Sequence, residues 1–185
     1  DPETLITALE QIDRITGTFE ALLRLARIES GAGRAAFVAL SLGDLVEEFR
    51  DTFGPVIEDA GQERRIETSD AATIDGDHDL LVQLLANLIQ NALRYGAEKQ
   101  TITLRVTGRQ VSLTDQGPGI PTSQREVALL PLHQGESTRQ NEGFGLGLSL
   151  VRAIAELHEA TLTLSEGEAG TGLCVTVAFP RLTKL

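Results

Sequence analysis

The stretch "NLIQNALRYG" at residues 87–96 decides the fold, because it joins an apolar helix face to polar side chains. It ends a segment, 77–95, whose apolar residues recur with helical periodicity: Leu80, Leu81, Leu84, Leu85, Leu88, Ile89 and Ala92. At about 100° per residue, Asn87, Asn91 and Arg94 lie within roughly 60° of each other at the edge of this face. The pattern predicts a helix over 77–95 whose polar edge borders a cleft.

The two asparagines and the arginine have the chemistry of a nucleotide site. An amide oxygen is a neutral, hard ligand that suits Mg²⁺, so Asn91 and Asn87 are candidate metal ligands. Arg94 offers a fork of donors to phosphate oxygens. The alternative is that these residues only cap the edge of a core, and their spacing does not decide between the two.

A second candidate lies in "DQGPGI" at residues 115–120. Asp115 shares strand parity with two apolar residues, so its carboxylate should point to the buried side and needs a donor there. An adenine amino group would supply one, and Gly117 and Gly119 would let backbone approach a flat ring. The alternative is a buried aspartate that holds only its own turn.

A third candidate is the glycine-rich stretch "GFGLGLSLV", which begins at residue 143. Gly143, Gly145 and Gly147 precede a helix whose free amides can meet phosphate. The polar stretch before it has the composition of a mobile lid and contains His133, Ser137, Thr138 and Arg139. Arg139 could reach phosphate from such a lid, whereas a solvated loop is the alternative.

The first 30 residues differ from the rest of the chain. Apolar residues over 4–28 follow alternating steps of three and four, which predicts a helix that pairs within a helical bundle. Docking on its own domain is the alternative. The break at "ESGAGR" then predicts three parts: a bundle helix over 1–30, a linker over 31–34 and a globular domain over 35–185.

The globular part mixes helices with alternating strand patterns. Strands are expected at 36–41, 64–69, 101–107, 111–113, 162–164 and 173–179, and helices at 41–60, 77–95, 122–130 and 147–158. Pairs of neighbouring strands look like hairpins, so the order predicts an α+β fold built as a two-layer α/β sandwich.

Charge and composition exclude several classes of protein. The net charge of −11 argues against nucleic-acid binding, which needs a basic surface. No apolar run approaches the ~20 residues of a membrane span, so membrane contact is not expected. The acidic, amphipathic start and the absence of Met suggest an excised piece of a longer protein. The histidines lack metal-ligand spacing and should be surface or core residues, and Cys174 should be a buried thiol.

In this order and spacing, the three stretches resemble the N, G1 and G2 boxes of histidine kinase catalytic domains. "LLRLARIESG" at 22–31 is similar to the end of the second dimerisation helix, and "GTGL" at 170–173 to a late glycine motif. The resemblance covers nearly the whole chain. It implies the Bergerat ATP-binding fold, shared with Hsp90, gyrase and MutL.

The resemblance also implies residue roles. Asn91 matches the magnesium-binding asparagine, Asn87 the polar residue one turn before it, and Arg94 a basic residue at the phosphates. Asp115 matches the acid that accepts the adenine amino group. The glycines match those below the base (Gly117, Gly119) and those of the lid hinge and phosphate loop (Gly143, Gly145, Gly147). Thr171 matches a position that supports the adenine-side water network.

The implied function is the cytoplasmic kinase core of a two-component sensor. With ATP and Mg²⁺, it would transfer the γ-phosphoryl group to a histidine on a helix absent from this sequence. The intact protein would be a homodimer, anchored in the inner membrane, that signals to a response regulator. Hydrolysing relatives carry Glu where this chain has Asn87, and an amide has no useful basicity, so slow hydrolysis is expected.

Two departures keep other functions open. No acceptor histidine box occurs, and "LLPLHQGES" at 129–137 has leucines and His133 where the family usually has phenylalanines. One alternative is a degenerate kinase that acts as a nucleotide-responsive binding module. Another is a hydrolase or serine-directed kinase of the same superfamily. The presence of Asn87 in place of the Glu of hydrolysing relatives argues against it.

Overall fold

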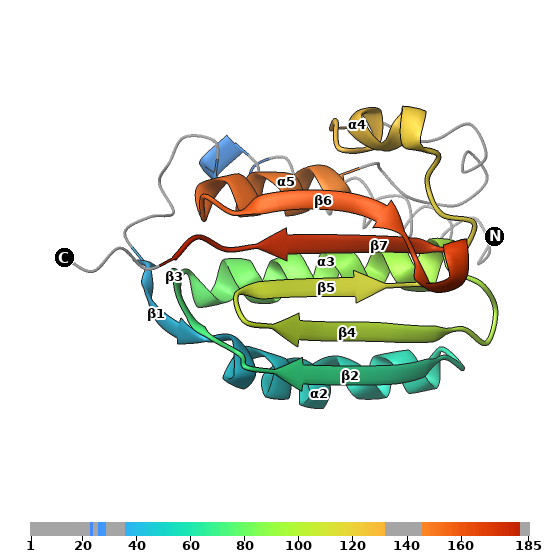
Figure 1. Ribbon diagram of the computed structural model, residues 1–185, viewed down its shortest axis with the longest axis horizontal. Helices are drawn as coiled ribbons and strands as arrows, with labels where there is room; N and C mark the ends of the chain where they lie inside the picture. The colour runs from blue at the N-terminus through green and yellow to red at the C-terminus, as the bar shows by residue number, and fades with distance from the viewer. Residues whose placement is uncertain (1–22, 24–25, 29–35, 132–145, 182–185) are drawn as a thin grey trace, which may run out of the picture.

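A computed structural model describes residues 23, 26–28, 36–131 and 146–181 (Figure 1). Of the helix predicted over 4–28, only Leu23 and 26–28 are described, and they are helical. The bundle pairing and the predicted linker lie outside the described residues and stay predictions. Ile28 is buried in the same hydrophobic cluster as the globular part, so this end of the helix packs on the domain.

A mixed sheet of five strands forms the centre of the domain, in the order β2-β4-β5-β7-β6. Its strands are β2 (Glu63–Ser69), β4 (Thr101–Thr107), β5 (Gln110–Thr114), β6 (Thr161–Glu166) and β7 (Leu173–Ala178). β2 and β4 pair in parallel, whereas β4–β5, β5–β7 and β6–β7 are antiparallel. The hairpin-like pairs predicted from the sequence are thus present, but the parallel pair was not foreseen.

Helices cover one face of this sheet (Figure 1). They are α2 (Leu42–Asp59), α3 (His78–Tyr95) and α5 (Gly147–Leu157). The turn η2 (Thr122–Gln124) and the short α4 (Arg125–Ala128) lie beside β6, and the turn η4 (Glu168–Gly170) connects β6 to β7. The predicted two-layer α/β sandwich is therefore confirmed.

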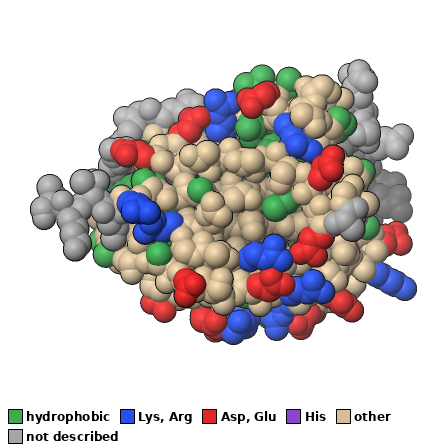
Figure 2. Space-filling view, viewed as in Figure 1, with side chains coloured by type: hydrophobic (Ala, Val, Ile, Leu, Met, Phe, Trp, Pro, Cys, Tyr) green, Lys and Arg blue, Asp and Glu red, His purple; other side chains and the backbone are tan. Residues whose placement is uncertain are grey.

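Alternation along the strands separates the two faces of the sheet. On β7, Leu173, Val175 and Val177 are buried against the helices, whereas the residues between them are only partly buried. The other face shows few hydrophobic side chains and is bordered by charged ones (Figure 2). Cys174, which was expected to be buried, is half-buried on this open face, with its Sγ 3.7 Å from Thr176 Oγ1.

A second, two-stranded sheet was only half predicted. β1 (Val38–Ser41) was expected, but its antiparallel partner β3 (Thr73–Gly76) was not. β3 has four residues and only Ile74 is an apolar residue buried in the core, so it carries no readable alternation. Its pairing with β1 brings Asp77 to the start of α3.

Local caps explain why the helices begin where the sequence predicts. Ser41 Oγ accepts from Asp44 N at 3.2 Å at the start of α2, and Asp77 Oδ1 accepts from Leu80 N at 3.1 Å at the start of α3. Each side chain satisfies an amide that has no partner within the helix. No described helix has the length and apolarity needed to cross a bilayer.

Asp77→Ala should lower the free energy of unfolding by about 1 kcal/mol, because it leaves the first amides of α3 without their cap. Urea denaturation followed by circular dichroism measures the change. Asp75→Ala, an exposed acid on β3, is the control and should change stability by less than about 0.5 kcal/mol. Equal losses in both variants would show that the cap does not stabilise α3.

The histidines that the structure describes are a core and a surface residue, as expected. His158 is buried, its Nε2 accepts from Asp77 N at 3.1 Å, and its ring stacks on Phe37 at 4.6 Å. His78 is exposed, and its hydrogen bond to Glu48 raises the pKa of its imidazole. His133 lies outside the described residues.

Candidate functional site

The polar edge of α3, formed by Asn87, Asn91 and Arg94, becomes more exposed towards the C-terminal end of the helix. Asn87 is buried and its Nδ2 donates to Gln83 O at 2.9 Å, which leaves the side-chain oxygen to act as a ligand. Asn91, one turn later, is half-buried, and Arg94 in the last turn is exposed. This gradient places the three side chains along one border between the core and solvent.

Asp115 lies at the end of β5 with one carboxylate oxygen engaged. Its Oδ1 accepts from Gly117 N at 2.8 Å and from Leu173 N at 3.1 Å. Oδ2 has no partner among the described residues, and every fully buried polar side-chain atom there has one. Oδ2 must therefore reach the surface. One oxygen thus ties down the turn, and the other is open to a donor. That this donor is an adenine amino group stays a prediction.

Burial raises the pKa of the Asp115 carboxyl, although the amides of Gly117 and Leu173 act in the opposite direction. Loss of hydration disfavours the charged form more than two backbone hydrogen bonds restore it. A ligand that donates a hydrogen bond to Oδ2 would therefore compensate for part of the missing water.

Glycines around Asp115 allow three backbone segments to touch. A Cβ on Gly172, which has φ +78°, would lie 1.9 Å from Asp115 O, and one on Gly119 would lie 2.6 Å from Gly172 O. A Cβ on Gly117 would lie 2.5 Å from Tyr95 O. The predicted reason for Gly117 and Gly119 was approach to a flat ring. The structure adds a packing reason for these two and for Gly172, because they join the loop to α3 and to β7.

The N-terminus of α5 lies against the polar edge of α3. Gly147 begins this helix, and a Cβ added to it would lie 3.0 Å from Asn91 Oδ1. The unpaired amides of a helix N-terminus favour an anion such as phosphate. The structure therefore brings together Asn91 and Gly147 at one part of α3, and Gly117 with Tyr95 at its end.

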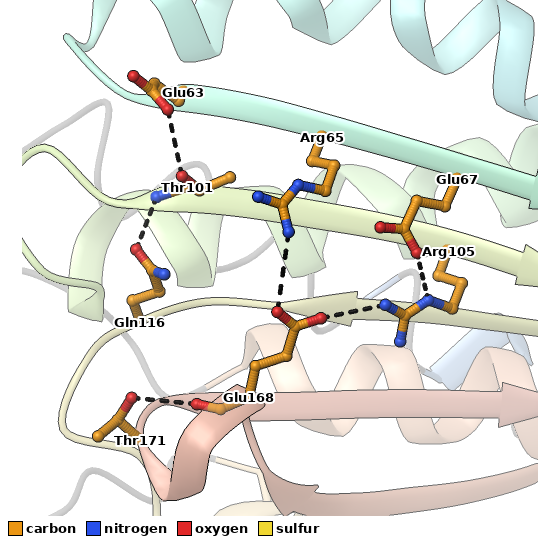
Figure 3. Close-up of polar contacts among 8 residues, drawn as sticks. All are labelled: Glu63, Arg65, Glu67, Thr101, Arg105, Gln116, Glu168 and Thr171. Carbon is orange, nitrogen blue, oxygen red and sulfur yellow. Dashed lines mark hydrogen bonds and ion pairs between the residues drawn. The ribbon is translucent and has the colours of Figure 1, made fainter.

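The turn between β6 and β7 is held by charged pairs across the open sheet face (Figure 3). Glu168 Oε1 lies 3.0 Å from Arg105 Nη2, and its Oε2 lies 3.8 Å from Arg65 Nη1. Arg105 Nε also pairs with Glu67 at 2.6 Å. In the same turn, Thr171 is exposed and its Oγ1 donates to Glu168 O at 3.3 Å. Exposed pairs of this kind each stabilise little, but together they fix the position of the turn beside Asp115.

Several predicted site residues fall outside the structure described. Arg139, Gly143 and Gly145 lie there, together with the predicted lid, and their roles stay predictions. Among the described residues, no cluster of His, Cys, Asp or Glu could hold a metal ion. A metal at Asn91 would thus depend on amide oxygens and ligand phosphates. A small hollow between α2 and α3, lined by Leu45, Phe49, Val82 and neighbours, includes none of the predicted site residues.

The sequence interpretation missed the groups that hold the site together. Leu173 donates its amide to Asp115 from a strand 58 positions later, which no local pattern could reveal. Gln100 is 1% exposed and links α3 to the loop after Asp115. In the sequence, a glutamine just before a strand looks like an ordinary polar loop residue. Only its burial in the structure shows that Gln100 has a role in holding the site together.

Comparison with known families matches residues 76–183 to the histidine kinase-, DNA gyrase B- and HSP90-like ATPases. The sensor protein kinase PmrB of Pseudomonas aeruginosa is 28% identical over 96% of this chain and 38% of its own length. The sensor histidine kinase HprS of Escherichia coli K12 is 31% identical over 87% of this chain and 36% of its own. The chain thus spans less than two fifths of the length of these relatives.

Solved structures share the fold. The catalytic domain of histidine kinase ThkA superposes with a TM-score of 0.66 at 25% identity, over 78% of this chain and 97% of that one. Full-length ShkA, in complex with AMPPNP, superposes with a TM-score of 0.72 at 23% identity, over 96% of this chain and 39% of that one. Both the sheet order and the covering helices therefore belong to a known architecture.

Proposed function

Because the chain belongs to the histidine kinase-, DNA gyrase B- and HSP90-like ATPases, as the ATP-binding catalytic domain of a sensor histidine kinase, we propose that it transfers the γ-phosphoryl group of ATP to a histidine outside the present sequence. The observation that supports this most is the arrangement around α3. Asn91 faces the N-terminus of α5, while the end of α3 contacts the loop of Asp115. One helix therefore joins a phosphate-binding position to an adenine-binding one.

The described residues fit an adenine nucleotide. Asp115 Oδ2 would accept from the adenine amino group, and Thr171 lies two residues before Leu173, whose amide donates to Asp115 Oδ1. Asn91 and Asn87 present amide oxygens for Mg²⁺, which would neutralise charge on the phosphates. Arg94, and Arg139 from the predicted lid, would pair with phosphate oxygens, and Gly143, Gly145 and Gly147 would let backbone amides approach them.

Transfer rather than hydrolysis follows from the side chain at position 87. In transfer, the bond between the γ-phosphorus and its bridging oxygen breaks, a bond to the acceptor nitrogen forms, and ADP leaves. Water attack would need a base, and Asn87 already donates its amide to Gln83 O and cannot take a proton. We further propose that the intact protein is a homodimer, anchored in the inner membrane, that passes the group to a response regulator on the cytoplasmic side. A cytoplasmic segment of the histidine kinase QseC is among the solved structures that share the fold.

The intact protein, extended upstream to include the acceptor histidine, tests this function with γ-labelled ATP and Mg²⁺. We expect a protein-bound label that is lost in acid and kept in base, as a phosphohistidine is, with slow release of free phosphate. A folded protein that binds ATP and forms no acid-labile label would contradict the proposal.

One observation favours a second function, a nucleotide-responsive module without transfer. Leu129 packs against the core, whereas Val127 and Leu130 are 39% and 48% exposed. Leu129 and Leu130 begin the stretch where the family usually carries phenylalanines, and Val127 lies just before it. Calorimetry that detects binding of an ATP analogue, together with no label transfer in the extended protein, would support this second function.

A further inference from the structure

The buried amide of Gln100 connects the two parts of the proposed nucleotide site. Gln100 lies just before β4 and is 1% exposed. Its Nε2 donates to Ala92 O, in the last turn of α3, at 2.7 Å. Its Oε1 accepts from Gln116 N, in the loop after β5, at 2.9 Å. A single side chain thus bridges the residue after Asn91 and the residue after Asp115.

The chemistry of these two bonds fixes the orientation of the amide. A carbonyl can only accept and a backbone N–H can only donate. If the Gln100 amide were turned over, its Oε1 would face Ala92 O, which is also an acceptor, and its Nε2 would face Gln116 N, which is also a donor. At a buried position, both of these mismatched pairs would leave polar groups without water and without a hydrogen bond, which costs free energy. Gln100 therefore has one stable orientation, and it holds both partners at once.

The surroundings are built around this amide. A Cβ on Gly96 would lie 1.9 Å from Gln100 Nε2, so the glycine that ends α3 makes room for the side chain. Gly96 has φ −72° and needs no left-handed conformation. A Cβ there would also lie 2.3 Å from Ala92 O, so close contact with both the Gln100 amide and the end of α3 is the reason for a glycine. Gln116 is held a second time, because its Oε1 accepts from Thr101 N at 2.9 Å (Figure 3).

We propose that Gln100 is a positioning residue for nucleotide binding, which sets the distance between Asn91 and Asp115. The inference rests on the proposed function, in which Asp115 takes the adenine and Asn91 the metal-bound phosphates. An ATP molecule that contacts both needs them at a spacing that matches its own length. Loss of the bridge would weaken binding of the whole nucleotide more than binding of its adenosine half or its phosphate half alone. Two linked groups bind more tightly than one only when their two contacts lie at the right spacing.

The test replaces Gln100 by Met, which has a similar length but cannot make either bond. In the full chain, Gln100→Met should weaken binding of a non-hydrolysable ATP analogue with Mg²⁺ about tenfold, which corresponds to ~1.4 kcal/mol. Isothermal titration calorimetry at low temperature measures this, after circular dichroism has shown that the variant is folded. Gln62→Ala is the matched control, because Gln62 Oε1 accepts from Gln100 N at 2.7 Å without taking part in the bridge. Its affinity should stay within about twofold of the wild type.

Titrations with the separate halves distinguish positioning from general damage. Adenosine alone and magnesium tripolyphosphate alone, followed by NMR shifts, should bind Gln100→Met within about twofold of the wild type. Hydrogen exchange should show a protected Gln116 amide in the wild type and a faster one in the variant. Should Gln100→Met prove too unstable for titration, Gln100→Asn, whose amide is one methylene shorter, takes its place with the same expected pattern.

Two results would overturn the inference while leaving the proposed function intact. One is an unchanged affinity of Gln100→Met for the analogue, and the other is a parallel loss for the analogue and both halves. A wild-type chain that binds neither the analogue nor the halves would contradict the proposed site itself, and with it this inference.

Discussion

Asp115→Asn is expected to lower the affinity for ATP by at least about 100-fold while the protein stays folded. The asparagine oxygen can replace Oδ1 and still accept from Gly117 N and Leu173 N. Its amide nitrogen would then stand where Oδ2 stands, and a donor would face the adenine amino donor. A hydrogen bond to a charged acceptor contributes about 1.5–3 kcal/mol, and leaving two donors opposed costs more. Equilibrium binding of a fluorescent ATP analogue measures the loss.

The same substitution should not reduce stability at neutral pH. Burial raises the pKa of the Asp115 carboxyl in the folded state, so its ionisation opposes folding. Such a group contributes stability that is complete below its unfolded pKa and is lost as the pH rises through its folded pKa. Asn does not titrate. The stability of Asp115→Asn relative to the wild type should therefore increase as the pH rises through that window, and then level off.

Urea denaturation of both proteins across the acid range checks this pH dependence, and nucleotide binding is measured on the same samples. Asp75→Asn, an exposed acid on β3, is the control and should change neither property. A variant that loses ATP binding only because it unfolds would show that Asp115 is a structural residue, contrary to the proposed adenine contact.

The parts of the fold that could be predicted are those with a local cause. The leucine face of α3, the start of α2 at Ser41 and the alternation on β7 each arise from neighbouring residues and could be read from the sequence. The strand β3 and the parallel pairing of β2 with β4 depend on residues far along the chain. No periodicity within one segment encodes which other segment will pair with it.

The candidate site divides in the same way. Asp115 and Asn91 could be singled out because a carboxylate on an apolar strand face and amides on a helix edge are locally unusual. Gln100 could not, because its burial is created by α3 and the loop of Gln116 closing over it. The glycines were found from the sequence, but the contact of Gly172 with Asp115 gives them a reason that spacing alone does not show.

Asn91→Ala is expected to remove the part of nucleotide affinity that depends on Mg²⁺. The wild type should bind ATP more tightly with Mg²⁺ than with EDTA, because Asn91 would hold the metal and the metal would neutralise charge on the phosphates. In the variant the two affinities should become nearly equal, since the substitution removes Asn91 Oδ1, the proposed ligand that faces the N-terminus of α5 at Gly147. Affinity measured in EDTA should change little, because the adenine contact at Asp115 remains.

The effect on phosphoryl transfer should be larger than the effect on binding. A metal ion contributes several kcal/mol by neutralising charge that develops on the transferred group, so the rate in the extended protein should fall about 10³-fold. Gln90→Ala, the exposed neighbour on the same helix, is the control and should transfer at the wild-type rate. Asn91→Asp keeps an oxygen ligand and should retain part of the Mg²⁺ dependence. If Asn91→Ala still bound ATP more tightly with Mg²⁺ than with EDTA, Asn91 would not be the main ligand of the metal, and Asn87 or groups outside the described residues would have to hold it.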